Sequence, residues 1–129
     1  MDSEISNYGG TETVLIVDDD KLVLNLLSNF FGEYGYNVIT ARDGEEAVDV
    51  YIHTVDEIHV VLMDIIMPRK DGIAASVEMT KHNPKAIIYF MSGYSPDTCN
   101  ELINRNFIKK PFLPSKLIKL VRERLDGDS

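Results

Sequence analysis

Short apolar segments alternate along the chain with stretches whose apolar residues recur every three or four positions. The apolar segments contain many β-branched residues, which is typical of strands buried on both faces of a sheet. They cover residues 13–17, 36–41, 58–63, 86–91 and 106–108. The intervening stretches have the spacing of helices that are buried on one side. We expect these helices at about residues 21–34, 44–54, 73–82, 96–104 and 114–125.

The first and last predicted helices have well-defined apolar stripes. Their members are Val23, Leu26, Leu27, Phe30, Phe31 and Tyr34 in the first, and Leu117, Leu120, Val121 and Leu125 in the last. Asp20 precedes the first helix as a capping residue, and Asp43 with Glu46 forms a capping-box pattern. Gly35 follows the first helix, where glycine commonly ends a helix, and Pro114 suits the first turn of the last.

Strands and helices that alternate in this way predict an α/β fold, in which a parallel sheet of five strands carries helices on both faces. Ligands of such sheets bind beyond the carboxyl ends of the strands. The polar residues at these ends are Asp18, Asp19 and Asp20 after the first strand, Asp64 after the third, Ser92 after the fourth, and Lys109 and Lys110 after the fifth. We therefore expect a functional site at this edge of the sheet.

The composition is that of one globular domain, and it narrows the function classes. The 129 residues include 13 basic and 21 acidic side chains, and the net charge of −8 disfavours binding to nucleic acids or acidic membranes. The single cysteine excludes an intrachain disulfide and a cysteine zinc site. The sequence shows neither a signal-peptide pattern nor an apolar run of the ~18 residues that a membrane span needs. We expect a cytoplasmic domain over residues 13–125, with a flexible leader over 1–12 and a tail over 126–129.

The predicted cluster of carboxylates requires a cation. Carboxylates that are held close together repel one another, and each is pushed towards protonation unless a positive charge lies nearby. A hard divalent ion with oxygen ligands, above all Mg²⁺, removes this conflict. With one lysine and one serine hydroxyl, such an ion supplies what phosphoryl transfer needs, and an aspartate can act as the nucleophile. These residues therefore indicate Mg²⁺-dependent phosphoryl chemistry.

Four motifs, in order along the chain, carry a resemblance to a known family. They are residues 14–20 (VLIVDDD), 60–68 (VVLMDIIMP) with Asp71-Gly72, 87–92 (IIYFMS) and 107–112 (FIKKPF). They resemble the response-regulator receiver domain of two-component signalling, the CheY-like family, over about residues 13–125. The resemblance implies the flavodoxin-like strand order 2-1-3-4-5. It also implies a signalling module, and not an enzyme with other substrates, that accepts a phosphoryl group from a histidine kinase or phosphotransfer protein.

The resemblance gives the acidic residues distinct roles. Asp64 is the expected phosphoacceptor. Asp19 and Asp64 are expected to bind Mg²⁺ through their carboxylates, and Asp18 mainly through a metal-bound water. Ile66 is expected to contribute its backbone carbonyl to the metal. Asp20, by contrast, is expected only to cap the first helix.

The other motif residues are expected to bind the phosphoryl group and to respond to it. Lys110 is expected to pair with Asp64 and later with the phosphoryl group, and Ser92 to hydrogen-bond a phosphoryl oxygen. Phe107 matches the aromatic switch position that responds to Ser92, and the Lys110–Pro111 bond resembles the family's cis peptide. The sequence does not identify the downstream protein, and it leaves open whether phosphorylation drives homodimerisation.

The resemblance also bears on the lifetime of the phosphoryl group. Ile66 and Tyr94 lie two positions beyond Asp64 and Ser92, beside the path of the water that hydrolyses the acyl phosphate. Ile66 has no group that orients a water, and Tyr94 is large enough to obstruct one. We therefore expect slow self-dephosphorylation.

Two other functions are compatible with parts of the sequence. The acidic triplet also matches the D-x-D of haloacid-dehalogenase-type phosphatases, with Asp18 as nucleophile and Asp20 as acid and base. Against this, Leu22 lies where that family prefers threonine or valine, and the position of Asp64 is left unexplained. A flavin or nucleotide carrier of the same fold is a third option, but the chain lacks a glycine-rich loop for phosphates.

Overall fold

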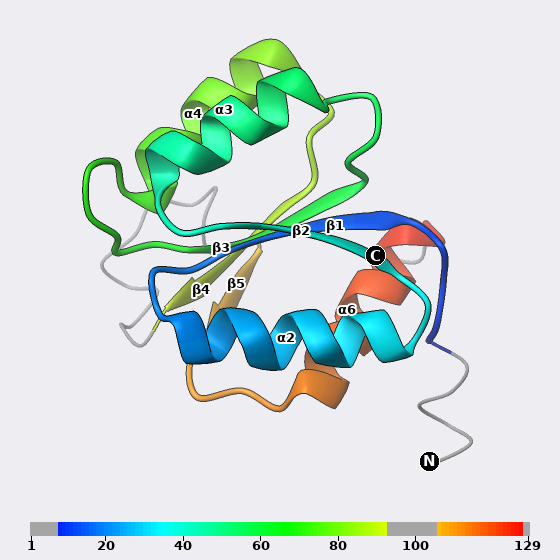
Figure 1. Ribbon diagram of the computed structural model, residues 1–129. Coiled ribbons are helices and arrows are strands. Elements are labelled where there is room, and N and C mark those ends of the chain that lie inside the picture. The colour runs from blue at the N-terminus through cyan, green and yellow to red at the C-terminus, as the bar shows by residue number, and fades with distance from the viewer. Residues whose placement is uncertain (1–7, 93–105, 128–129) are drawn as a thin grey trace.

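A five-stranded parallel sheet forms the centre of the molecule (Figure 1). The computed structural model describes residues 8–92 and 106–127. Its strands are β1 (Thr13–Val17), β2 (Asn37–Ala41), β3 (Val60–Asp64), β4 (Ile88–Ser92) and β5 (Phe107–Lys109). Their order across the sheet is β2-β1-β3-β4-β5, and all neighbouring strands are parallel. The predicted α/β fold and the predicted strand order are both confirmed.

Helices cover both faces of this sheet. Within the described residues they are α2 (Lys21–Glu33), α3 (Gly44–His53), α4 (Gly72–His82) and α6 (Pro114–Leu125). Figure 1 shows α3 and α4 together on one face and α2 and α6 on the other. Because the strands are parallel, their carboxyl ends lie along one edge of the sheet. None of the helices in the described ranges is long and apolar enough to cross a membrane.

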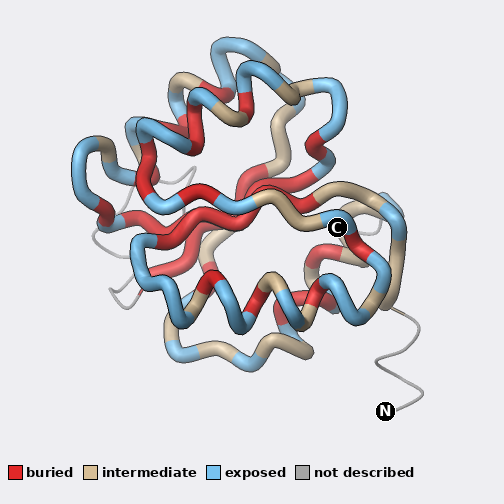
Figure 2. Tube along the Cα trace, viewed as in Figure 1, coloured by how far each residue is buried: buried red, intermediate tan, exposed pale blue. Residues whose placement is uncertain are grey.

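Successive side chains of the strands enter two separate apolar cores. In β1, Leu15 and Val17 pack with α3 and α4, whereas Val14 and Ile16 pack with α2 and α6. Figure 2 shows that the buried positions concentrate in the sheet and on the sides of the helices that face it. Burial on both faces explains why the three central strands, β1, β3 and β4, are nearly continuously apolar.

The helix ends follow the predicted capping residues. The carboxylates of Asp20 and Asp43 accept hydrogen bonds from backbone N–H groups in the first turns of α2 and α3, at 2.9 and 2.8 Å. Gly35 follows α2 with a φ of +97°, a left-handed conformation that glycine adopts without strain. Asp71 caps α4 in the same way at 2.8 Å, a role that the sequence analysis did not assign.

The stripe predicted for α2 packs in or against the core except at Leu26, and Leu24, which was not predicted, is buried. Leu24, Leu27 and Phe31 face the core, whereas Leu26 is 57% exposed. The apolar residues of this helix form two adjacent rows, and only the row that contains Leu24 can face the sheet. Two strands also end later than predicted, so that Asp64 and Ser92 are their last residues. The predicted helix at 96–104 lies outside the described residues.

Part of the predicted leader is held against the domain. Arg122 of α6 binds the carboxylate of Glu12 through both terminal nitrogens, at 2.9 and 2.6 Å. The Tyr36 hydroxyl donates a hydrogen bond to the Tyr8 carbonyl at 2.6 Å, and the Gly10 N–H donates to a carbonyl at the end of α2. Residues 8–12 of the predicted leader therefore make side-chain and backbone contacts with the domain.

Candidate functional site

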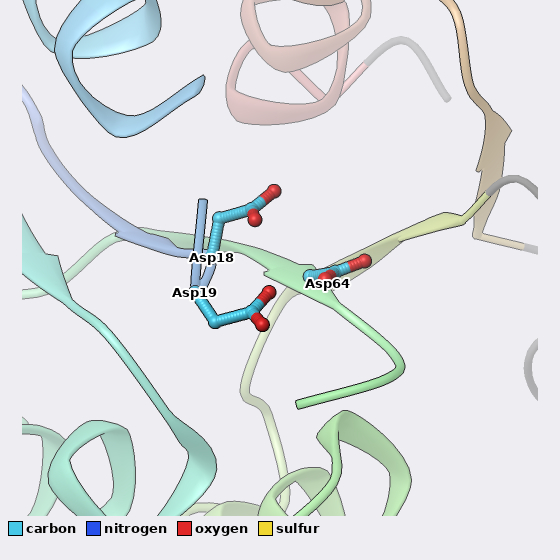
Figure 3. A group of neighbouring side chains, drawn as sticks. All are labelled: Asp18, Asp19 and Asp64. Carbon is cyan, nitrogen blue, oxygen red and sulfur yellow. The ribbon is translucent and has the colours of Figure 1, made fainter. Parts of the chain in front are cut away.

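Three carboxylates meet at the carboxyl edge of the sheet (Figure 3). Asp18 and Asp19 directly follow β1, and Asp64 is the last residue of β3. These strands are far apart in sequence but adjacent in the sheet, and Val17 pairs with Met63. One oxygen from each carboxylate lies within 4.8 Å of the others. The predicted meeting of these three residues is therefore observed.

Asp18 lies deepest in the site and is fully buried. Its Oδ1 accepts a hydrogen bond from the backbone N–H of Asp20 at 2.9 Å. Its Oδ2 accepts one from Lys110 Nζ at 2.7 Å. Because both oxygens already have donors, Asp18 is better placed for indirect contact with a metal than Asp19, whose side chain is exposed.

Lys110 brings a positive charge to the cluster from the end of β5. Its Nζ lies 2.7 Å from Asp18 Oδ2 and 3.5 Å from Asp64 Oδ1, so the nearer partner is Asp18 and not the expected Asp64. Burial lowers the pKa of the Lys110 ammonium, but the hydrogen bond and charge of Asp18 outweigh it, and the net pKa lies above its ordinary value. The backbone N–H of Lys110 also donates to the Ser92 carbonyl at 2.7 Å.

The carboxyl group of Asp64 does not ionise as readily as an ordinary aspartate. Burial raises its pKa to about 6, and the negative charge of Asp18 contributes further. Lys110 acts in the opposite direction but does not cancel these effects. This is the conflict expected of clustered carboxylates, and a divalent cation beside the cluster would relieve it.

The other predicted site residues lie around this cluster. Ser92 is buried at the end of β4, and Phe107 is partly buried at the start of β5. The side chain of Ile66 is exposed in the loop after β3, and Lys109 is exposed as well. The Lys110–Pro111 peptide bond is cis, as predicted. Tyr94 lies outside the described residues.

Two glycines allow close backbone contacts beside the site, and the sequence analysis did not assign them this role. A Cβ at Gly72 would collide with the Asp64 carbonyl oxygen, and the Gly72 N–H donates to the Ile65 carbonyl at 2.7 Å. A Cβ at Gly44 would collide with the Lys70 carbonyl oxygen. The signal in the sequence was an Asp-Gly pair at the start of each helix; Asp43 was interpreted only as a capping residue, and Asp71-Gly72 only as part of a family motif.

The donor atoms of the cluster suit a hard cation. The three side chains offer carboxylate oxygens and neither nitrogen nor sulfur, which matches the preference of Mg²⁺. One side chain is exposed and two are buried, so that solvent can reach one side of the cluster and complete the coordination sphere with water.

The chain belongs to the response-regulator receiver domain family. The family model for the response regulator receiver domain matches residues 14–122, which include all three carboxylates and Lys110. This match confirms the resemblance seen in the four motifs, and it favours a receiver over the alternative of a dehalogenase-type phosphatase.

The similar proteins are signalling proteins and include much longer chains. A probable transcriptional regulator, ycf27, of Guillardia theta is 36% identical over 86% of this chain and 44% of that protein. The transcriptional regulatory protein CpxR of Escherichia coli K12 is 32% identical over 84% of this chain and 47% of that protein. The sensor kinase CckA of Brucella abortus is 30% identical over 94% of this chain but only 13% of that protein. The chain thus spans about half or less of these relatives.

A solved structure supports the same assignment. The CheX–CheY–BeF3–Mg+2 complex from Borrelia burgdorferi contains a chain with a TM-score of 0.79 and 31% identity, covering 88% of each chain. A CheY-like receiver domain protein from Methanospirillum hungatei JF-1 has a TM-score of 0.80 and 26% identity, covering 92% of this chain and 97% of that one. The chain is therefore a receiver module of the response-regulator class.

Proposed function

We propose that Asp64 accepts the phosphoryl group in this receiver domain, with Mg²⁺ held at the carboxylate cluster. The observation that carries the proposal is the convergence of Asp18, Asp19 and Asp64 with Lys110 at one end of the sheet. Asp19 and Asp64 would bind the metal through carboxylate oxygens, Asp18 through water, and Ile66 through its carbonyl. Bound Mg²⁺ would neutralise charge on the phosphoryl oxygens.

The proposed reaction is the transfer of a phosphoryl group from a histidine to an aspartate. A carboxylate oxygen of Asp64 attacks the phosphorus, a P–O bond forms, and the P–N bond of the donor breaks with its electron pair left on the histidine nitrogen. The phosphoryl group adds charge to a pocket that already holds three carboxylates. Lys110, 3.5 Å from Asp64, is placed to bind a phosphoryl oxygen once it exchanges Asp18 for this new partner.

The proposed response uses residues on the two neighbouring strands. Ser92 ends β4 and would hydrogen-bond another phosphoryl oxygen, and Phe107 starts β5 beside Phe90. The Ser92 carbonyl already accepts a hydrogen bond from the Lys110 N–H. A movement of either residue would therefore displace the other. These contacts connect the added charge to a change in the packing of β5.

The proposed phosphodonor is a histidine kinase or phosphotransfer protein that docks beside α2. An apolar groove of about 350 Å³ runs between α2 and the segment after β5, and Lys110 of the carboxylate site forms part of its wall. Leu22 and Leu26 on this side of α2 are 78% and 57% exposed. A donor that brings a phosphohistidine to Asp64 would cover this groove, because groove and site share Lys110.

We propose further that the chain acts as a signalling module and turns over no external substrate. The acid–base role that the phosphatase alternative requires of Asp20 conflicts with its position: its carboxylate caps α2 by accepting the Leu22 N–H at 2.9 Å, and its side chain is exposed. Asp18 is poorly placed as the nucleophile, because it is fully buried and a substrate cannot reach its oxygens as the site stands.

Peptide mapping after phosphorylation tests the proposal. Incubation with a small acyl-phosphate donor and Mg²⁺ is expected to place the phosphoryl group on the peptide that contains Asp64. Asp64→Asn, which is nearly isosteric, is expected to lose this labelling while its unfolding transition remains cooperative. Asp20→Asn, which also removes one carboxylate but keeps a good capping residue, serves as the matched control. Labelling at Asp18, or full labelling of Asp64→Asn, would overturn the proposal.

A further inference from the structure

The loop from Ile65 to Asp71 connects β3 to α4, and its conformation is held by contacts outside the carboxylate cluster. Within this β3–α4 loop, Arg69 has a φ of +67°. A left-handed backbone is unfavourable for a long side chain and persists where the surroundings determine the conformation. Because the loop begins directly after Asp64 and includes Ile66, its conformation bears on the proposed metal site.

Arg69 reaches from this strained position to the start of α3. Its Nε lies 3.5 Å from Asp43 Oδ2. The Asp43 side chain is only 8% exposed, and its other oxygen caps α3 by accepting the Glu46 N–H at 2.8 Å. The Arg69 side chain is 70% exposed, so the pair joins a solvent-exposed guanidinium to a largely buried carboxylate, and the backbone contacts described next must add to its effect.

Backbone contacts join the same two segments. The Gly44 N–H donates to the Lys70 carbonyl at 3.1 Å, and a side chain at Gly44 would prevent this approach. Further along, the Gly72 N–H donates to the Ile65 carbonyl at 2.7 Å and closes the loop beside Asp64. The Lys70 side chain binds Glu78 of α4 at 2.6 Å. The loop is therefore fastened to α3 on one side and to α4 on the other.

We propose that Asp43 and Arg69 form a latch that positions the β3–α4 loop for Mg²⁺ binding. This inference rests on the proposed function, since it concerns the same metal site. Both residues act through the loop and not by contact with the metal, so they are positioning residues. If the latch opens, the loop spends less time in the conformation that binds the metal, and the apparent Mg²⁺ affinity falls by that fraction.

Arg69→Asn is the decisive substitution, because asparagine tolerates a left-handed backbone but has neither the positive charge nor the length to reach Asp43. Simple electrostatics predicts tighter Mg²⁺ binding, since a positive charge near an acidic site is lost. The latch predicts weaker binding, by about three- to tenfold in the dissociation constant measured by titration calorimetry. The sign of the change therefore separates the two effects. Arg69→Lys, which keeps the charge, is expected to recover most of the affinity.

Arg42→Asn is the matched control. Arg42 is exposed, immediately precedes Asp43 and loses the same charge on substitution. This variant is expected to bind Mg²⁺ as tightly as the wild type or more tightly. Asp43→Asn keeps a good capping residue, breaks the pair and removes a negative charge, so it is expected to weaken Mg²⁺ binding at least as much as Arg69→Asn, and the double variant is expected to bind no more weakly than Asp43→Asn.

A measurement without metal tests the loop directly. Hydrogen exchange of the Gly44 and Gly72 amides is expected to be faster in Arg69→Asn than in the wild type, while the amides of β1 are unchanged. If the wild type binds no Mg²⁺, the proposed function fails. If the wild type binds Mg²⁺ and Arg69→Asn binds it as tightly or more tightly, or exchanges these amides at the wild-type rate, the latch alone is overturned.

Discussion

At the scale of single residues, the site depends on a carboxylate that resists ionisation. Burial and the charge of Asp18 raise the pKa of Asp64 to about 6, although Lys110 lies 3.5 Å away. An unfolded chain ionises this residue near the ordinary value of about 4. Between these two pH values the folded protein binds more protons than the unfolded one, so its free energy of unfolding falls as the pH rises.

This difference predicts how Asp64→Asn changes stability in the absence of divalent ions. At pH 7.5 (about 1.5 units above the folded pKa) the variant is expected to be more stable than the wild type by about 1–3 kcal/mol, because it carries no ionised carboxylate at this position. The difference is expected to shrink as the pH falls from about 6 to about 4. Urea unfolding in a chelating agent measures it at each pH.

Added Mg²⁺ provides the control for this prediction. The metal is expected to stabilise the wild type and to stabilise Asp64→Asn much less, so that the order of stability becomes closer or reverses. If the wild type were more stable than Asp64→Asn at pH 7.5 without metal, the raised pKa of Asp64 in the folded protein would be contradicted.

At the scale of elements, α2 uses its two apolar rows for different purposes. Leu24, Leu27 and Phe31 are buried in the core between the sheet and α6, and Leu27 also forms the floor of the groove. Leu26 lines the groove and is exposed, as is Leu22 one turn before it. Periodicity predicted this helix but placed Leu26 in the buried stripe and omitted Leu24. Substitutions at neighbouring leucines of this helix can therefore distinguish effects on stability from effects on docking.

Leu27→Ala is expected to destabilise the fold by about 2–5 kcal/mol, since it leaves a cavity in the core. Leu26→Ala is expected to change stability by less than about 0.5 kcal/mol. Leu26→Ala is, however, expected to be phosphorylated more slowly by a phosphohistidine protein. Its phosphorylation by a small acyl-phosphate donor is expected to keep the wild-type rate. Equal effects of Leu26→Ala on both donors would argue against docking at this groove.

At the scale of the whole molecule, segments from both ends of the domain are joined. Glu12 lies just before β1, and Arg122 lies in the last turns of α6. Their side chains form a bidentate ion pair. The hydrogen bond from Arg122, together with its charge, lowers the pKa of Glu12 to about 2. A lowered pKa contributes stability above the unfolded value of about 4.5, and this contribution is lost as the pH falls towards about 2.

Glu12→Gln is expected to reduce the free energy of unfolding at pH 7 by about 1 kcal/mol, a value that allows for screening by solvent at a side chain that is one-quarter exposed. The difference from the wild type is expected to disappear as the pH falls from about 4.5 to about 2. Glu57→Gln, in the exposed turn after α3, is the control and is expected to change stability little at either pH. A pH-independent difference for Glu12→Gln would indicate a packing effect and not an ion pair.

The strands, most of the helices and the residues that meet at the site could be predicted from the sequence. The strands were recognisable because burial on both faces forces continuous apolar segments, as in residues 13–17 and 60–64. The site residues were recognisable because parallel strands bring their carboxyl ends to one edge, so that Asp18, Asp19 and Asp64 had to lie near one another. Both inferences use local features of the sequence: continuous apolar segments and the polar residues that follow them.

Only the tertiary structure decided which of these neighbours touch. Lys110 Nζ lies closer to Asp18 than to Asp64, and the backbone N–H of Asp20 binds the other oxygen of Asp18. The contact between Asp43 and Arg69 could not be predicted from the sequence either. Such contacts depend on the distance and orientation of segments that are remote in sequence, and these follow from how the sheet and helices pack, which periodicity does not encode.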